Sequence, residues 1–208
     1  WRYFKSGASE STLTAGGIRA VRTAVSNDFI HWTQFKDVSY NDSQAIQLYT
    51  NQVQHYYRAP QIFIGIPTRY IERGWSPSMR ALPDLEHRDL RSSHSLRYGT
   101  ALTDAMLMTS RNGTEFERWE ESFLRPGIER DGTWNYGQQY VGWGIVETKS
   151  ELKGAPDELS FYATEHSWTS EMATSDLRRY TLRLDGFVSV QAPMSGGEII
   201  TKPLKFKG

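Results

Sequence analysis

Short apolar segments separated by turn residues run along the whole chain, and they predict many short β-strands. The clearest case is residues 104–110, where the run Met-Leu-Met precedes a Ser-Arg-Asn-Gly turn. A second short strand begins at Phe116 and stops at the Pro-Gly pair of residues 126–127. An apolar strand, a polar turn and a returning strand are typical of a β-hairpin. No segment has the periodicity of an amphipathic helix, so the pattern predicts an all-β fold.

Residues 20–32 repeat the hairpin in a shorter form, running from an apolar strand through a Ser-Asn-Asp turn to two aromatic residues. The matching pairs are Ser26 and Ser110, Phe29 and Phe116, and Trp32 and Trp119. One supersecondary unit is therefore expected twice. The polar side chains of both turns are expected to bond their own backbone, as Ser, Asn and Asp do in tight turns. The two tryptophans are expected to pack between neighbouring sheets.

Grouped in chain order, the predicted strands form four-stranded antiparallel meanders. The three groups are 1–5, 17–26 and 31–38; 46–53, 61–67, 104–110 and 116–125; and 140–146, 158–164, 177–184 and 187–191. Four-stranded sheets in series are the blades of a β-propeller. We therefore expect propeller blades over residues 1–192, with the first blade incomplete, and a last strand within residues 193–208 that closes the ring or begins a following β-domain. An irregular β-sandwich stays open, because strand counts alone do not separate the two folds.

Composition limits the partners more than the fold. The 24 basic residues equal the 24 acidic ones, which argues against a nucleic-acid partner because such proteins carry a basic footprint. No apolar run approaches the roughly 18 residues of a membrane span, so no membrane partner is expected. Cysteine is absent, which excludes disulfides and Cys-ligated metals. The 7 Trp and 11 Tyr suit both a β-core and sugar stacking.

Residues 68–99 differ from the rest of the chain and predict a long polar loop. They hold two prolines, two histidines and many arginines. Long loops in compact domains are often functional, and the arginines suggest acidic sugars. The loop also carries Glu72, Asp84, Glu86 and Asp89, so a solvated loop of mixed charge is the preferred interpretation.

Several segments have a pattern found in known enzymes: 26–32, 58–60, 104–113, 159–166, 177–190 and 196–203. Through them the chain resembles the five-bladed β-propeller glycoside hydrolases, that is the arabinanase/β-xylosidase and invertase/levansucrase groups, and an uncharacterised bacterial branch of that superfamily. The resemblance implies a partial five-bladed β-propeller that hydrolyses glycosidic bonds of a poly- or oligosaccharide. It also implies a secreted or periplasmic bacterial protein, with a catalytic Asp and a signal peptide expected before Trp1.

Strand direction gathers one set of polar residues at one end of the meanders, where inner and third strands start and second strands end. The residues expected there are Glu165, Asp104, Arg69, His166, Asn51, Trp134 and Tyr136. Two carboxylates at such a place suit glycoside cleavage, which needs one protonated acid and one ionised base or nucleophile. Their separation is about 5 Å in retaining enzymes and about 6.5–9.5 Å in inverting ones.

We expect Glu165 to be the general acid and Asp104 the second carboxylate, while the other five residues of that set bind substrate. Plain structural alternatives stay open: Glu165 as a solvated strand end, Asp104 as a turn cap, and Arg69 as no more than a salt-bridge partner of Asp104. A non-catalytic carbohydrate-binding propeller and a structural β-domain also stay open. No cofactor or metal is expected, because no His, Asp and Glu set has ligand spacing, although a water-coordinated Ca²⁺ in a propeller channel would leave no trace in the sequence.

Overall fold

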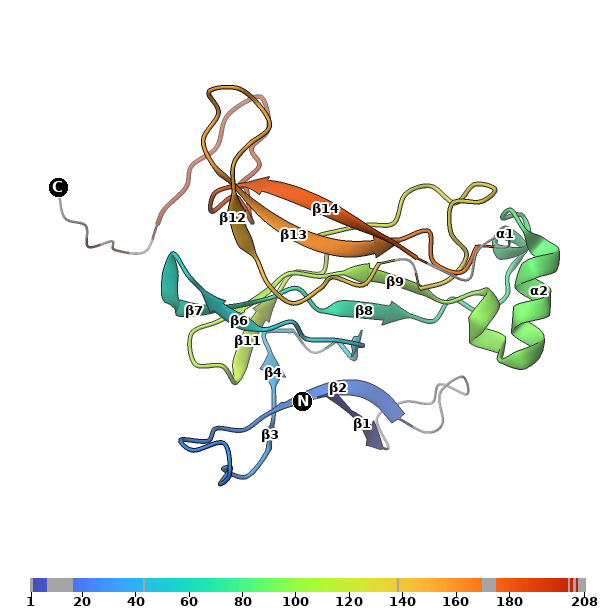
Figure 1. Ribbon diagram of the computed structural model, residues 1–208, viewed down its shortest axis with the longest axis horizontal. Helices are drawn as coiled ribbons and strands as arrows, with labels where there is room; N and C mark the ends of the chain where they lie inside the picture. Colours follow the sequence, from blue (N-terminus) through green and yellow to red (C-terminus); the bar gives the residue numbers. More distant parts are fainter. Residues whose placement is uncertain are drawn as a thin grey trace.

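The computed structural model describes residues 2–6, 17–42, 44–137, 139–169, 175–201, 203 and 205. Most of the regular structure is β, as predicted, and it forms mainly antiparallel sheets (Figure 1). The strands are β1 (Arg2–Ser6), β2 (Gly17–Thr23), β3 (Lys36–Asp37), β4 (Ser39–Tyr40), β5 (Gln47–Leu48), β6 (Gln54–Tyr56), β7 (Ala59–Gly65), β8 (Thr68–Ile71), β9 (Leu102–Ala105), β10 (Met108–Ser110), β11 (Glu115–Arg118), β12 (Val146–Thr148), β13 (Glu158–Glu165) and β14 (Asp176–Arg183).

The predicted four-stranded unit at residues 46–125 is present, but its first three strands are each broken once. β5 and β6 form the inner strand, β7 and β8 the second, β9 and β10 the third, and β11 the fourth. The short strand β4 pairs in parallel with the other edge of β11. The breaks lie side by side across the meander. At the first break Gln52 has a positive φ of 49°, and at the second Pro67 has no N–H to donate to a neighbouring strand. Across the break the N–H of Met106 donates to the carbonyl of Pro67 at 3.0 Å. We call this unit the central meander.

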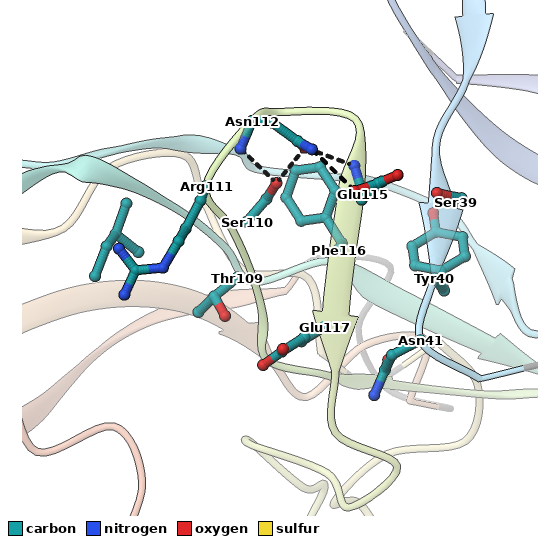
Figure 2. Close-up of a pocket in the computed structure, with 11 residues that line it drawn as sticks. Ser39, Tyr40, Asn41, Thr109, Ser110, Arg111, Asn112, Glu115, Phe116 and Glu117 are labelled. Carbon is teal, nitrogen blue, oxygen red and sulfur yellow. Dashed lines mark hydrogen bonds between the residues drawn. The ribbon is translucent and has the colours of Figure 1, made fainter. Parts of the chain in front are cut away.

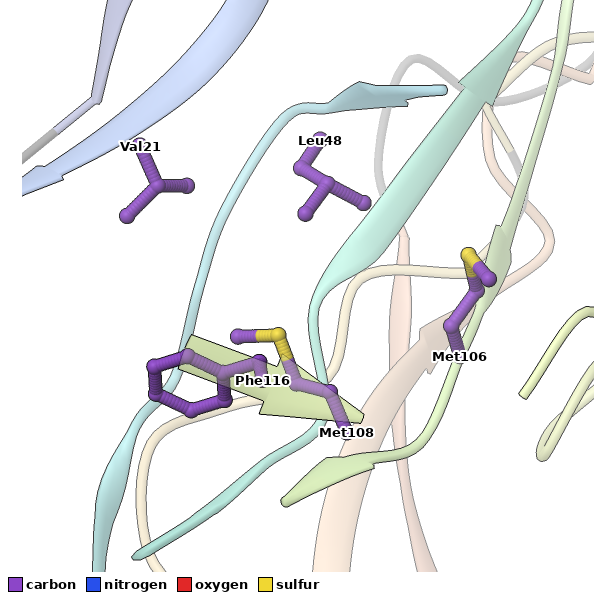
Figure 3. Packing of buried hydrophobic residues seen from close by; sticks show 5 residues of the cluster. All are labelled: Val21, Leu48, Met106, Met108 and Phe116. Atoms are coloured by element: carbon purple, nitrogen blue, oxygen red, sulfur yellow. The ribbon is translucent and has the colours of Figure 1, made fainter. Parts of the chain in front are cut away.

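Both faces of the central meander are covered, as the three tiers of strands in Figure 1 show. Met106 and Met108 point to one side, where they meet Val21 of β2 (Figure 3). Leu107 points to the other side, where it joins a cluster with Leu159 of β13. Alternate side chains of a strand face opposite sides of a sheet, so an apolar run without alternation is what two buried faces require. The sheets β1-β2-β3 and β12-β13-β14 therefore pack on opposite faces of the central meander.

The repeated turn is present, but its register differs from the one predicted. Ser26 forms an isolated bridge with Trp32, and the pairing of β10 with β11 places Ser110 opposite Phe116. Trp32 is therefore the counterpart of Phe116. The prediction that paired Phe29 with Phe116, and Trp32 with Trp119, was wrong by three residues. It matched aromatic residues by type, whereas position in the turn decides.

The predicted strands at 187–191 and 198–206 are absent from the described residues. The hairpin turn after β14 is present, with Asp185 at a φ of 58°. Its carboxylate accepts hydrogen bonds from Tyr56 at 2.5 Å and from Arg58 Nε at 3.0 Å. The ring of Phe187 packs against that of Tyr56 with 5.3 Å between centroids. These contacts hold the chain against the central meander, so it does not return along β14.

The prediction of a long loop at residues 68–99 was also wrong. It contains β8, the helices α1 (Pro77–Arg80) and α2 (Leu85–His94), and the 3₁₀ helix η1 (Leu96–Gly99). The fully buried side chain of α2 is that of Arg88. The helix therefore has no apolar stripe that would have predicted it from the sequence. In the part of the chain that is described, neither helix has the length and apolarity to cross a bilayer. The sheets of the described residues form no closed barrel or ring.

Candidate functional site

The predicted carboxylate Asp104 lies on β9, directly across from Arg69 on β8. Cross-strand partners share a face of the sheet, and here they form a bidentate ion pair, with 2.9 Å from Nε to Oδ1 and 2.5 Å from Nη2 to Oδ2. The hydroxyl of Ser122 also donates to Asp104, whose side chain is only 4% exposed. Of the alternatives for Arg69, the structure contains the salt bridge.

The other predicted carboxylate, Glu165, ends β13 and is held by two residues of β14. It accepts hydrogen bonds from Arg178 Nε at 2.6 Å and from the hydroxyl of Tyr180. Burial, and then this bond to Glu165, raise the pKa of Tyr180. The next residue, His166, has a φ of 55° and lies 2.7 Å from Asp176 through Nδ1. Among the residues that the structure describes, the hydrogen-bond partners of Glu165 and those of Asp104 have no residue in common.

The remaining predicted residues are engaged within the protein. Asn51 accepts a hydrogen bond from the N–H of Val53 at 3.2 Å, which is a local turn. Tyr136 is buried and packs edge to face against Tyr98 and Trp168, with 5.7 and 5.6 Å between ring centroids. Trp134 is 6% exposed. The two predicted stacking rings thus form no open platform.

Asp104 and Trp134 nevertheless line one pocket of about 350 Å³, which we call the Asp104 pocket. Its other lining residues are Arg73, Leu82, Leu102, Ser122, Arg125, Pro126, Gly127, Ile128 and Glu129. Trp134 is fixed at its edge by a 3.1 Å hydrogen bond from Nε1 to the carbonyl of Gly127. Glu165, His166, Asn51 and Tyr136 are not among the lining residues. The structure therefore gathers in this pocket one predicted carboxylate and one predicted aromatic residue.

The pocket also contains a buried ion network that the sequence did not reveal. The carboxylate of Glu129 contacts Arg88 Nη2, and Arg73 Nη1 at 3.5 Å. Arg88 is fully buried and donates from Nη1 to the carbonyls of Gly99 at 3.0 Å and Asn135 at 3.1 Å. These arginines were assigned to a solvated loop, and for Arg88 that assignment was wrong. The sequence signal for Glu129 is weak, namely an acidic residue shortly after the Pro-Gly stop.

A larger pocket of about 530 Å³ lies on the outer part of the central meander (Figure 2). It contains the Ser110 turn, where Ser110 Oγ accepts from the N–H groups of Asn112 at 3.2 Å and Gly113 at 2.9 Å. These bonds confirm the structural interpretation of this turn. The aromatic residues of the pocket, Tyr40 and Phe116, belong to the core cluster around Met108. Little aromatic surface is left there for a ligand.

Within the described residues, no group of three or more His, Cys, Asp or Glu side chains could hold a metal ion. Comparison with known proteins identifies no relative: no family model, no curated protein and no solved structure matches the chain. The class of protein is therefore argued from the fold and the Asp104 pocket alone.

Proposed function

We propose that the chain is a carbohydrate-binding β-propeller domain that takes a saccharide in the Asp104 pocket. The observation that carries the proposal is that Asp104 and Trp134, both chosen from the sequence for sugar chemistry, line the same pocket. Ligand pockets typically combine apolar and aromatic walls with a few convergent polar groups. The tryptophan ring, the Ser122 hydroxyl and the charged side chains around them provide that combination.

The stacking of the sheets supports the propeller part of the proposal. Three sheets succeed each other in chain order, and the central meander packs against its neighbours through both faces. In a propeller each blade is a meander of four antiparallel strands that contacts the blade before it and the blade after it. A five-bladed ring would place the Asp104 pocket at the end of the blades where second strands end and third strands begin.

Binding is favoured over hydrolysis by the state of the two predicted catalytic carboxylates. A glycosidase needs one carboxyl group that can give a proton to the leaving oxygen. Both oxygens of Asp104 contact Arg69, and Glu165 is held by Arg178 and Tyr180 outside the pocket. Hydrolysis by Glu165 and Asp104 stays a prediction.

Calorimetric titration of the full chain with a panel of neutral and acidic plant and algal oligosaccharides tests the proposal. We expect binding that weakens by roughly fivefold in Ser122→Ala, because a typical hydrogen bond contributes about 1 kcal/mol. Ser93→Ala is the matched control, since Ser93 is exposed on α2 and bonds only its own helix. Absence of binding across the panel would overturn the proposal. Release of reducing ends that Glu165→Gln abolishes would replace it with hydrolysis.

A further inference from the structure

The charges around the Asp104 pocket do not cancel. Its lining contains two carboxylates and two arginines: Asp104, Glu129, Arg73 and Arg125. Each carboxylate also forms an ion pair with an arginine that does not line the pocket, Asp104 with Arg69 and Glu129 with Arg88. Four guanidinium groups therefore stand against two carboxylates, which leaves an excess of two positive charges at this site.

Arg73 is held in place and still has an unused donor. Its Nε donates to the carbonyl of Thr100 at 2.7 Å, and its guanidinium lies 5.9 Å from the ring centroid of Trp134. Its contact with Glu129 is long, at 3.5 Å, and its Nη2 is buried without a hydrogen-bond partner. Burial lowers the pKa of Arg73. A buried donor without an acceptor costs about 1–3 kcal/mol, so a small rotation of the guanidinium that brings Nη2 to a ligand acceptor in the pocket would be favoured.

Arg125 adds an exposed guanidinium to the lining of the same pocket. Its backbone is anchored because the preceding residue, Leu124, bridges to Ala105 of β9. Its side chain is exposed and makes no hydrogen bond or ion pair with any residue that the structure describes. The lining of the pocket thus includes one guanidinium with a buried unpaired donor, that of Arg73, and one exposed guanidinium, that of Arg125.

We propose that Arg73 and Arg125 bind the anionic group of an acidic saccharide. This inference rests on the proposed function and names its substrate class. A guanidinium presents parallel N–H groups that match a planar carboxylate or a sulfate, and such charge-assisted bonds are about twice as strong as neutral ones. The carboxylate of a uronic acid and a sugar sulfate ester are the two sources of this chemistry. Ser122, and the small part of Trp134 that is exposed to the pocket, contact the uncharged part of the sugar.

The test compares ligands that differ only in charge. The full chain is titrated with oligogalacturonate, with its neutral methyl ester, and with a sulfated galactan oligosaccharide of similar length. We expect at least one acidic ligand to bind about tenfold more tightly than the methyl ester, with an affinity that falls as salt is added. Arg125→Gln should remove most of that difference. Arg130→Gln is the matched control, because Arg130 is an exposed arginine nearby that does not line the pocket.

The outcomes separate this inference from the proposed function. Preference for oligogalacturonate identifies the carboxylate as the recognised group, and preference for the sulfated ligand identifies the sulfate. Equal affinity for charged and neutral ligands, or an equal loss in Arg125→Gln and Arg130→Gln, overturns the acidic-saccharide inference while leaving saccharide binding intact. Failure of every saccharide to bind overturns both.

Discussion

The turns at Ser26 and Ser110 share a set of hydrogen bonds but lie in different surroundings. In each turn the serine hydroxyl accepts from the N–H two residues later, at 3.3 Å from Ser26 to Asp28 and at 3.2 Å from Ser110 to Asn112. In each, Oδ1 of the Asp or Asn accepts from the N–H three residues further on, at 2.7 and 2.9 Å. The local sequence is therefore sufficient to form the turn.

The aromatic residues after the two turns differ sharply in burial. Phe116, on β11, is 3% exposed and packs with Met108 in the core between two sheets. Its counterpart Trp32 is 42% exposed, so the prediction that Trp32 packs between sheets was wrong. The serine motif fixes the turn, but a neighbouring sheet has to cover the aromatic residue. Comparing the two turns therefore distinguishes what the local sequence determines, the turn, from what tertiary packing determines, the burial of the aromatic residue.

The largest expected difference between the turns concerns these two aromatic residues. Phe116→Ala leaves a cavity in the core, and we expect it to lower the free energy of unfolding by about 3–5 kcal/mol. Trp32→Ala removes a ring that is already partly hydrated, so its effect should stay below about 1 kcal/mol. Urea denaturation of both variants, followed by circular dichroism, measures the difference. Equal losses would mean that Trp32 is covered in solution and would break the comparison.

A smaller effect is expected where the backbones correspond but the residues do not. Phe29 and Gly113 occupy the same turn position with φ values of 61° and 74°. Glycine adopts this conformation without strain, whereas other residues lose roughly 1–2 kcal/mol. A Cβ at Gly113 would lie 3.4 Å from the Phe63 ring, an ordinary contact, so backbone strain should dominate the cost of Gly113→Ala. We expect Gly113→Ala to destabilise by about 1–2 kcal/mol and Phe29→Gly to stabilise slightly in the same assay. A stabilising Gly113→Ala or a destabilising Phe29→Gly would show that the turns are not equivalent.

How far the sequence predicts the molecule depends on the same division between local and tertiary effects. Turn residues and apolar runs predicted the central meander and the pairs β13–β14 and β10–β11. Strand direction also predicted that Asp104 would lie near the end of the second strand, and Arg69 lies opposite it. Each of these features depends on residues close in sequence or on the alternation of one strand.

The failures involve side chains that meet across the fold. α2 was missed because it buries Arg88 in place of an apolar residue, with partners as distant as Asn135 and Glu129. The strand after β14 was mispredicted because Asp185 is bound by Tyr56. The place of Glu129 in the Asp104 pocket was missed for the same reason, because its carboxylate is bound by arginines more than forty residues earlier in the chain. No periodicity in the sequence encodes such pairs.

The smallest expected effect concerns one titratable difference between the turns, Asp28 in place of Asn112. Hydrogen bonds from the His31 side chain, then from the backbone of His31 and Ile30, lower the pKa of Asp28 below its usual value. A carboxylate with a depressed pKa stabilises the folded turn at pH values above its unfolded pKa, about 3.9. That contribution is lost as the pH falls below about 4 towards the lower folded value, because protonation removes the charged acceptor. Asn112 has no carboxylate, so its own contribution to the Ser110 turn cannot titrate.

The backbone amides that these side chains hold report the difference directly. Amide chemical shifts of Ile30 and His31 should stay nearly constant between pH 5 and 4 and move only at lower pH. Both N–H groups donate to Asp28 Oδ1, each within 3.0 Å, and this carboxylate keeps its charge below the usual pKa of an aspartate. In Asp28→Asn the same amides should stay nearly constant at the lower pH as well, because the asparagine has no charge to lose. The effect is local, because Asp28 lies on the surface. If the wild-type amides instead moved with a midpoint of about 4, the ordinary pKa of an aspartate, Asp28 would not be holding the turn through its charge, and the two turns would differ in burial alone.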